Sequence, residues 1–170
     1  MLIIRQEKLF DFQNIYDLAK VAFQTAKVAD GNEQDYVNKL RASGGYISDL
    51  ALVAEEDKKL GGHIMLTKTY ITTGGSRVEA LLLAPLSVAL TYRKLGIGSE
   101  LVEKSFELAK NLGFRIVFVV GDPTFYSRFG FKASALFGVK HVPTISDEYV
   151  MAHELSVGAL VGVTGTVTFT

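Results

Sequence analysis

The chain has 170 residues, of which 48% are hydrophobic and 21% are charged. This length predicts one domain over residues 1–170 that is large enough to bury an apolar core. Lysine plus arginine and aspartate plus glutamate both number 18, so no overall charge favours nucleic acid or an anionic membrane as a partner. Cysteine is absent, which excludes disulfides, thiolate catalysis and thiolate metal sites and suits a reducing compartment.

The N-terminus and the apolar segments argue against export and membrane insertion. Residues 1–5 turn polar at once and lack the apolar core of a signal peptide. The longest apolar run, residues 80–90, is interrupted by Pro85 and Ser87, and a membrane-spanning helix needs about 20 residues. We therefore expect a cytoplasmic protein with no membrane partner.

Hydrophobic periodicity in the first half of the chain predicts a strand, two helices and three further strands. The expected elements are a strand at 2–6, an amphipathic helix through 15–23 that ends at Asp30-Gly31, a helix at 33–41, and strands at 50–55, 60–71 and 78–88. The strand at 78–88 is almost continuously apolar, which is typical of a strand covered on both faces.

The second half begins with the longest amphipathic pattern in the chain. The expected elements are a helix at 97–112 that Gly113 caps, a strand at 115–120, a short helix at 123–129 that Asp122-Pro123 starts, and strands at 131–136, 149–155 and 161–169. The strands at 78–88 and 115–120 flank the long helix and form a βαβ unit. These two strands should be parallel, and the rest of the sheet can be antiparallel.

A turn with two glycines, Arg93 to Ser99, leads from the buried strand into the long helix. The first N–H groups of a helix have no partners within it and lie at the positive end of its dipole, so they can bind a phosphate-type anion. Gly96 and Gly98 allow the backbone to approach closely, while Arg93 and Lys94 add positive charge and Ser99 adds a hydroxyl. The alternative is a tight turn with no ligand.

Motifs of other ligand-binding and catalytic classes are incomplete or missing in the sequence. Leu101 stands where a dinucleotide-binding fingerprint needs its third glycine, and no G-K-[ST] follows as in a P-loop. His63, His141 and His153 lack metal-ligand spacing, so no metal is expected. No G-x-S-x-G element is present, which argues against a hydrolase of that type.

Two ordered segments carry a resemblance to a known family. Residues 93–98 resemble the R/Q-x-x-G-x-G/A signature of the GNAT superfamily of acyl-CoA-dependent N-acyltransferases. Residues 121–131, an aromatic segment ending in Gly-Phe, resemble a second element of that family, and residues 85–88 and 121–123 resemble its YhbS-like branch. The resemblance implies an α/β fold: a mixed, mostly antiparallel central sheet with flanking helices and a parallel βαβ core that splays near Val88.

The same resemblance implies a site. The backbone of Leu86, Ser87 and Val88 would pair with the pantetheine of acetyl-CoA. The amides of Arg93, Lys94, Leu95, Gly96, Ile97, Gly98 and Ser99 would hold the pyrophosphate. Phe125 would line the thiol end. Tyr126, four residues before Gly130, would be the general acid, although the sequence alone also permits an aromatic packing role for it.

The implied function is transfer of an acetyl group from acetyl-CoA to a primary amine of a small molecule or peptide, by direct attack in a ternary complex of a monomer or homodimer. Some family members use a strand glutamate as general base, and Leu82 stands at that position here. Glu79 has the opposite strand parity, so it would point to the other face of the sheet. The remaining alternatives for deprotonating the amine are ordered water, with Glu55 or Glu56 as distant bases, or an acceptor amine whose own pKa is low. The alternative function is a non-catalytic CoA or acyl-CoA sensor.

Overall fold

The computed structural model describes residues 1–26, 29 and 31–169. The strands run over Leu2–Gln6 (β1), Ala51–Glu56 (β2), Lys59–Thr73 (β3), Ser76–Val88 (β4), Ile116–Val120 (β5), Lys132–Ala133 (β6), Val139–Lys140 (β7), Val150–Glu154 (β8) and Gly165–Thr168 (β9). The α-helices run over Phe12–Ala22 (α1), Glu33–Arg41 (α2), Ile97–Asn111 (α3) and Pro123–Tyr126 (α4).

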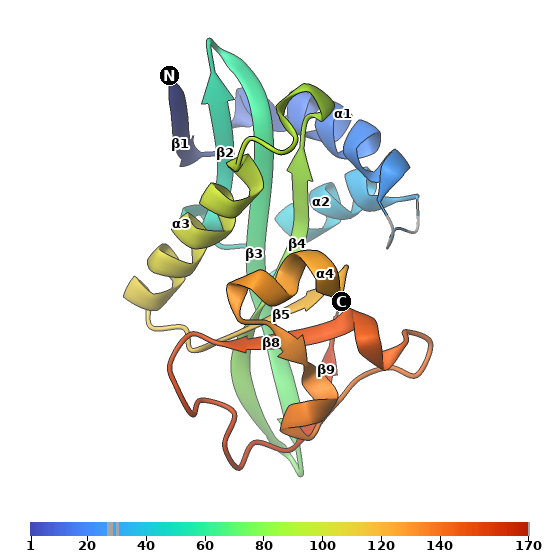
Figure 1. Cartoon of the computed structure of the whole chain (residues 1–170). Coiled ribbons are helices and arrows are strands. Elements are labelled where there is room, and N and C mark those ends of the chain that lie inside the picture. The colour runs from blue at the N-terminus through green and yellow to red at the C-terminus, as the bar shows by residue number, and fades with distance from the viewer. Residues whose placement is uncertain (27–28, 30, 170) are drawn as a thin grey trace.

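A twisted mixed sheet forms the centre of the molecule (Figure 1). Its strand order is β1-β2-β3-β4-β5-β8-β6, and β9 pairs with the far end of β3 and with β7. The β4–β5 and β7–β9 pairs are parallel and the others are antiparallel. The α/β fold with a mostly antiparallel sheet and a parallel βαβ core is therefore confirmed.

Helices cover both faces of the sheet. On one face, Leu101 and Val102 of α3 are buried against Ile64 and Leu66 of β3. On the other, α1 and α2 bury apolar side chains against alternate residues of β2 and β3, namely Ile15, Val37 and Leu40 against Ala51, Val53 and Met65. The alternation along β3 follows from the two-residue period of a strand.

The parallel pair β4–β5 separates early. Its register runs only from Leu81–Val117 to Leu83–Val119, whereas β4 continues to Val88 along β3. The splay therefore begins after Leu83 and not near Val88 as predicted. Beyond that point the β5 side of β4 has no neighbouring strand among the described residues, so its backbone groups face the gap.

Two of the late strand predictions were too long. The strand predicted at 131–136 is only β6, because a 3-10 helix at Ser134–Phe137 follows and ends at Gly138 with φ of 79°. The strand predicted at 161–169 is only β9, because Gly158 and Gly162 turn the preceding segment with positive φ angles. The helix end predicted at Asp30-Gly31 falls partly outside the described residues, and α1 itself ends at Ala22.

Candidate active site

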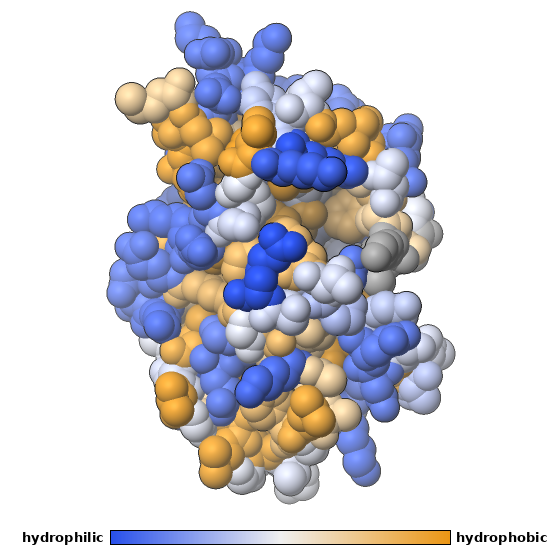
Figure 2. Space-filling model, in the orientation of Figure 1, coloured by the Kyte–Doolittle hydropathy of each residue, from blue (hydrophilic) through white to orange (hydrophobic). Residues whose placement is uncertain are grey.

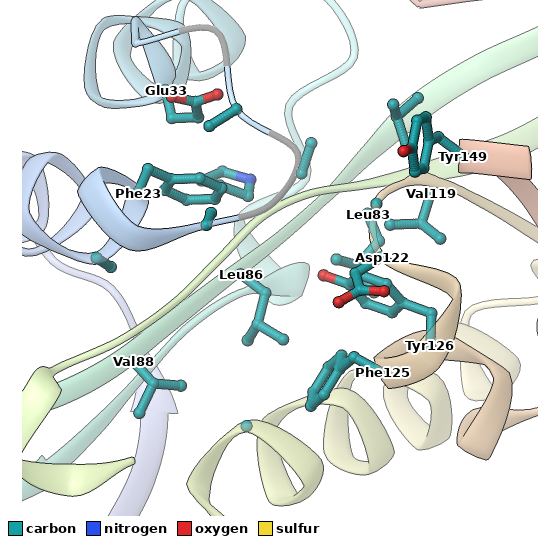
Figure 3. Close-up of a pocket in the computed structure, with 18 of the residues that line it drawn as sticks. Phe23, Glu33, Leu83, Leu86, Val88, Val119, Asp122, Phe125, Tyr126 and Tyr149 are labelled. Carbon is teal, nitrogen blue, oxygen red and sulfur yellow. The ribbon is translucent and has the colours of Figure 1, made fainter. Parts of the chain in front are cut away.

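A cleft of about 1340 Å³ opens where β4 and β5 separate. It is bounded by β4, the start of α3, the end of β5 with α4, and described residues between α1 and α2 such as Phe23 and Thr25 (Figure 3). Apolar surface lies in the hollow at the middle of this face, and strongly hydrophilic side chains lie beside it (Figure 2). Ligand pockets typically measure about 300–1,000 Å³, so this cleft has room for more than one small molecule.

The end of β4 supplies one side of the cleft. Leu86 and Val88 line it, whereas Ser87 points to the opposite face, where it is 1% exposed and pairs in register with His63. The edge of β4 that faces the cleft pairs with no described strand after Leu83, so it can accept an extended ligand as an additional strand.

The N-terminal end of α3 lies next to this edge. Gly96 precedes the helix with φ of 84°, and the first helical hydrogen bond runs from Glu100 N to Gly96 O at 3.0 Å. No described side chain caps this end, so the N–H groups of residues 97–99 are available to an anion. A Cβ added to the buried Gly98 would lie 3.5 Å from both Phe125 Cζ and Val88 Cγ2.

Nine of the eleven residues predicted to hold the coenzyme line the cleft, and Ser87 and Leu95 do not. The Leu95 side chain is 68% exposed. Arg93 lines the cleft, but its guanidinium donates to Thr25 Oγ1 at 2.7 Å and to Ala22 O at 2.8 Å. Arg93 therefore ties the glycine turn to the end of α1, a role the sequence did not indicate.

Tyr126 lies on α4 at the β5 side of the cleft. Asp122 caps this helix by accepting from Thr124 N at 3.0 Å, as predicted from Asp122-Pro123. The phenol ring packs over Gly121, where an added Cβ would lie 2.5 Å from Tyr126 Cε2. Burial raises the pKa of Tyr126 above its usual value, and the Asp122 carboxylate raises it further.

The rest of the lining, the second wall, contains residues on both sides of the cleft that the sequence analysis did not single out. They come from the α1–α2 region and from the C-terminal third of the chain: Phe23, Thr25, Glu33, Tyr36, Ile145, Tyr149 and Phe169. In Figure 3, Phe23 and Glu33 lie across the cleft from Tyr149 and Tyr126. No motif marks these positions, because their proximity arises only from the fold.

Acidic side chains in the described lining are Glu33 and Asp122. Leu82 lines the cleft at the position where the family resemblance implies a strand base. Glu55 and Glu56 lie outside the lining at the end of β2, where Glu55 is 3.4 Å from Arg5. Glu79 also lies outside it, 3.9 Å from Lys68. The distant candidates for the base therefore do not face this cleft.

A buried polar network holds α2 against the sheet behind this wall. Glu7 accepts from Arg41 Nε at 2.8 Å, from the Tyr46 hydroxyl at 2.8 Å and from His63 Nε2 at 3.0 Å. Burial alone would raise the pKa of Glu7, but the hydrogen bonds from His63, Arg41 and Tyr46 lower it to about 2. Burial also lowers the pKa of His63, which favours the neutral ring, and a ring protonated at Nε2 donates to the carboxylate.

The described part of the chain contains no group of three or more potential metal ligands. Within the same residues, no helix is both long enough and apolar enough to cross a bilayer.

Comparison with known proteins decides the family. Residues 4–134 match the model of the acetyltransferase (GNAT) domain. The chain belongs to the GNAT acetyltransferase family. This GNAT chain is 29% identical over 169 residues to the uncharacterized N-acetyltransferase YhbS of Escherichia coli K12, covering 99% of the chain and 96% of YhbS. It is 32% identical over 127 residues to the uncharacterized N-acetyltransferase YjhQ of the same organism, covering 74% of the chain and 66% of YjhQ.

Solved GNAT structures agree with this assignment. The structure of E. coli YhbS in complex with CoA superposes with a TM-score of 0.89 at 29% identity, over 99% of this chain and 89% of that one. A GNAT acetyltransferase from Brucella melitensis in complex with acetyl-CoA gives a TM-score of 0.80 at 28% identity, over 100% of this chain and 96% of that one. The predicted resemblance to the YhbS-like branch is confirmed.

Proposed function

We propose that this GNAT chain binds acetyl-CoA in the cleft and transfers the acetyl group to a primary amine of a small molecule or peptide within a ternary complex. The observation that carries the proposal is the uncapped N-terminus of α3 beside the unpaired edge of β4. CoA and acetyl-CoA are bound by the two structural relatives, which supports this choice of ligand.

The residues present suit the coenzyme. The N–H groups at the start of α3 favour a pyrophosphate, and Lys94 adds a positive charge at the same end of the cleft. The absence of a side chain at Gly98 leaves space between α3, Val88 and Phe125. The edge of β4 after Leu83 suits the amide groups of a pantetheine arm.

The reaction joins the amine nitrogen to the thioester carbonyl carbon and breaks the carbon–sulfur bond. The amine loses a proton and the leaving thiolate gains one. Tyr126 is the proposed donor to the sulfur, because this residue lines the cleft and its raised pKa keeps it protonated through the neutral range. An acid loses its proton only as the pH rises through its pKa. Because the pKa of Tyr126 is raised, we expect no deprotonation of Tyr126, and no loss of kcat from that cause, near neutral pH.

A second candidate function is CoA sensing without catalysis. The observation that favours it is the leucine at position 82, where a carboxylate could have served as general base. Turnover separates the two functions. Amine-dependent release of free thiol from acetyl-CoA supports the transferase, whereas CoA binding without release against any amine supports the sensor.

Tyr126→Phe provides the sharpest test of the chemistry. We expect kcat to fall about 100-fold, the lower end of what a general acid contributes, with the Kd for CoA unchanged by calorimetric titration. Gly121→Ala moves the same ring without removing its hydroxyl, because the new Cβ would overlap Tyr126, and should lower kcat about 10-fold. Equal loss of kcat and CoA affinity in Tyr126→Phe would show that the tyrosine only packs.

A further inference from the structure

The cleft continues beyond Tyr126 into a region that differs in chemistry from the coenzyme end. We call this region the acceptor chamber and define it by Phe23, Glu33, Tyr36, Ile145, Tyr149 and Phe169. Phe23, Glu33 and Tyr36 form one side of it, and the other three residues, from the chain before β8 and after β9, form the other side. Phe23 and Tyr149 lie on opposite sides of it (Figure 3).

The side of the chamber that comes from the C-terminal part of the chain is held by contacts with β5 and with the residue that follows it. Tyr149 O accepts from Gly121 N at 2.9 Å, and Gly121 is the residue over which the Tyr126 ring packs. Phe169 contacts Phe118 of β5 with ring centroids 6.2 Å apart. A molecule packed against Tyr149 and Phe169 is therefore held next to the segment that carries the proposed general acid.

The carboxylate of the chamber, Glu33, lies on the side that comes from the N-terminal part of the chain. Glu33 begins α2, and its Oε1 accepts from Gly31 N at 3.2 Å, which fixes the carboxyl group at the helix start. In the described lining, the basic side chains are Arg93 and Lys94 of the glycine turn and Arg128, which lies 4.8 Å from the centre of the Phe125 ring. The six residues that define the chamber are one carboxylate, Glu33, and five aromatic or aliphatic side chains.

We infer that the acceptor is a primary amine attached to an aromatic or branched apolar group, with Glu33 selecting the cationic amino group and the chamber walls binding the apolar part. This inference rests on the proposed function, since it concerns the second substrate of the same reaction. A polyamine would require several carboxylates, but the second acid of the lining, Asp122, caps α4. An amine that carries a phosphate group would place this anion beside the Glu33 carboxylate and apolar side chains, which is unfavourable for binding.

The first experiment compares acceptors of matched amine chemistry. Thiol release at saturating acetyl-CoA is measured with 2-phenylethylamine, ethylamine, spermidine and phosphoethanolamine. We expect kcat/KM for 2-phenylethylamine to exceed that for each other amine at least about 10-fold, because burial of the phenyl group is favourable only for that compound. Higher kcat/KM for spermidine or phosphoethanolamine would overturn the inference.

Variants separate the two parts of the chamber. Glu33→Gln should raise the KM for 2-phenylethylamine about 10-fold or more, the loss expected for a hydrogen bond to a charged group, with kcat much less affected. Phe23→Ala should reduce the preference for 2-phenylethylamine over ethylamine. The control is Glu103→Gln, at an exposed position on α3 outside the cleft, which should behave as the original protein.

A binding measurement removes the dependence on turnover. Calorimetric titration of 2-phenylethylamine into the protein saturated with CoA should show an affinity that falls about 10-fold in Glu33→Gln. Unchanged affinity and unchanged KM in that variant would overturn the role of Glu33. Thiol release with other amines but not with 2-phenylethylamine would overturn the inference and leave the proposed function standing, whereas CoA binding without release against any amine would overturn both.

Discussion

The two walls of the cleft are built in different ways. The wall of β4 and the start of α3 comes from one continuous stretch, residues 82–99, and offers mainly backbone groups to a ligand. The second wall, which is the rest of the lining, is assembled from residues of the α1–α2 region, the segment before β8 and Phe169, and offers side chains. The first wall suits a coenzyme whose structure does not vary, and the second can change its specificity through side-chain substitutions alone.

The walls also differ in what supports them. Apolar packing supports the first wall, because Ile97 and Leu101 of α3 are buried in the core. The second relies on buried charge as well, because Glu7 links β1 to Arg41 of α2 and to His63 of β3. Arg93 joins the two walls through Thr25 and Ala22. Each support can be broken separately.

The largest effect is expected from Gly98→Val in the first wall. An added Cβ already lies at contact distance from Phe125 and Val88, so the two further methyl groups would enter the space between α3 and β4. We expect CoA affinity to fall at least about 100-fold by calorimetry, since overpacked side chains do not yield readily. Gly44→Val, at an exposed glycine with open space around it, is the matched control. Unaltered CoA binding in Gly98→Val would contradict the placement of the coenzyme.

The next effect is on stability, from Glu7→Gln behind the second wall. Loss of the carboxylate leaves Arg41 without its charged partner, and we expect the free energy of unfolding to fall about 3 kcal/mol in urea denaturation. Glu103→Gln, at an exposed site, should change it little. CoA affinity should be retained by the folded variant, because the first wall is built without Glu7.

The same network predicts a pH dependence. Its hydrogen bonds lower the pKa of Glu7 to about 2 in the folded protein, from 4.5 for the free side chain. The stabilisation is therefore complete above about pH 4.5 and is lost as pH falls from there towards 2. Urea denaturation across this range should show a smaller acid-dependent loss in Glu7→Gln. Identical pH profiles for the two proteins would show that Glu7 titrates normally.

The smallest effect is expected from the link between the walls. Thr25→Val keeps the shape of the side chain but removes the acceptor of the Arg93 hydrogen bond, while Ala22 O still binds the guanidinium. We expect the KM for acetyl-CoA to rise about 3-fold, as fits the loss of one exposed hydrogen bond. Thr91→Val, at an exposed threonine two residues before Arg93, should leave KM unchanged. A change in kcat alone would contradict a role in coenzyme binding.

Sequence reasoning succeeded where local chemistry decides the structure. Helix α3 follows an apolar stripe and ends at Asn111, two residues before Gly113, whose φ is 91°, and α4 begins after its Asp122 cap. It was less accurate for the late strands, because β6 and β9 are short and their lengths depend on pairing with β8 and β3. It also gave no sign that the Arg93 guanidinium bonds to Thr25 and Ala22, because a motif records the residue type and not the direction of its side chain.

By itself, the sequence determined the family resemblance, the βαβ unit and the glycine turn at the start of α3, because these depend on neighbours within about twenty residues and on backbone geometry. Only the tertiary structure decided that β4 and β5 part after Leu83, that Arg93 bonds to the end of α1, and that Glu33, Tyr149 and Phe169 share one cleft. These facts depend on contacts between segments far apart in the chain, and the pairing of such segments leaves no periodic signal in a single sequence.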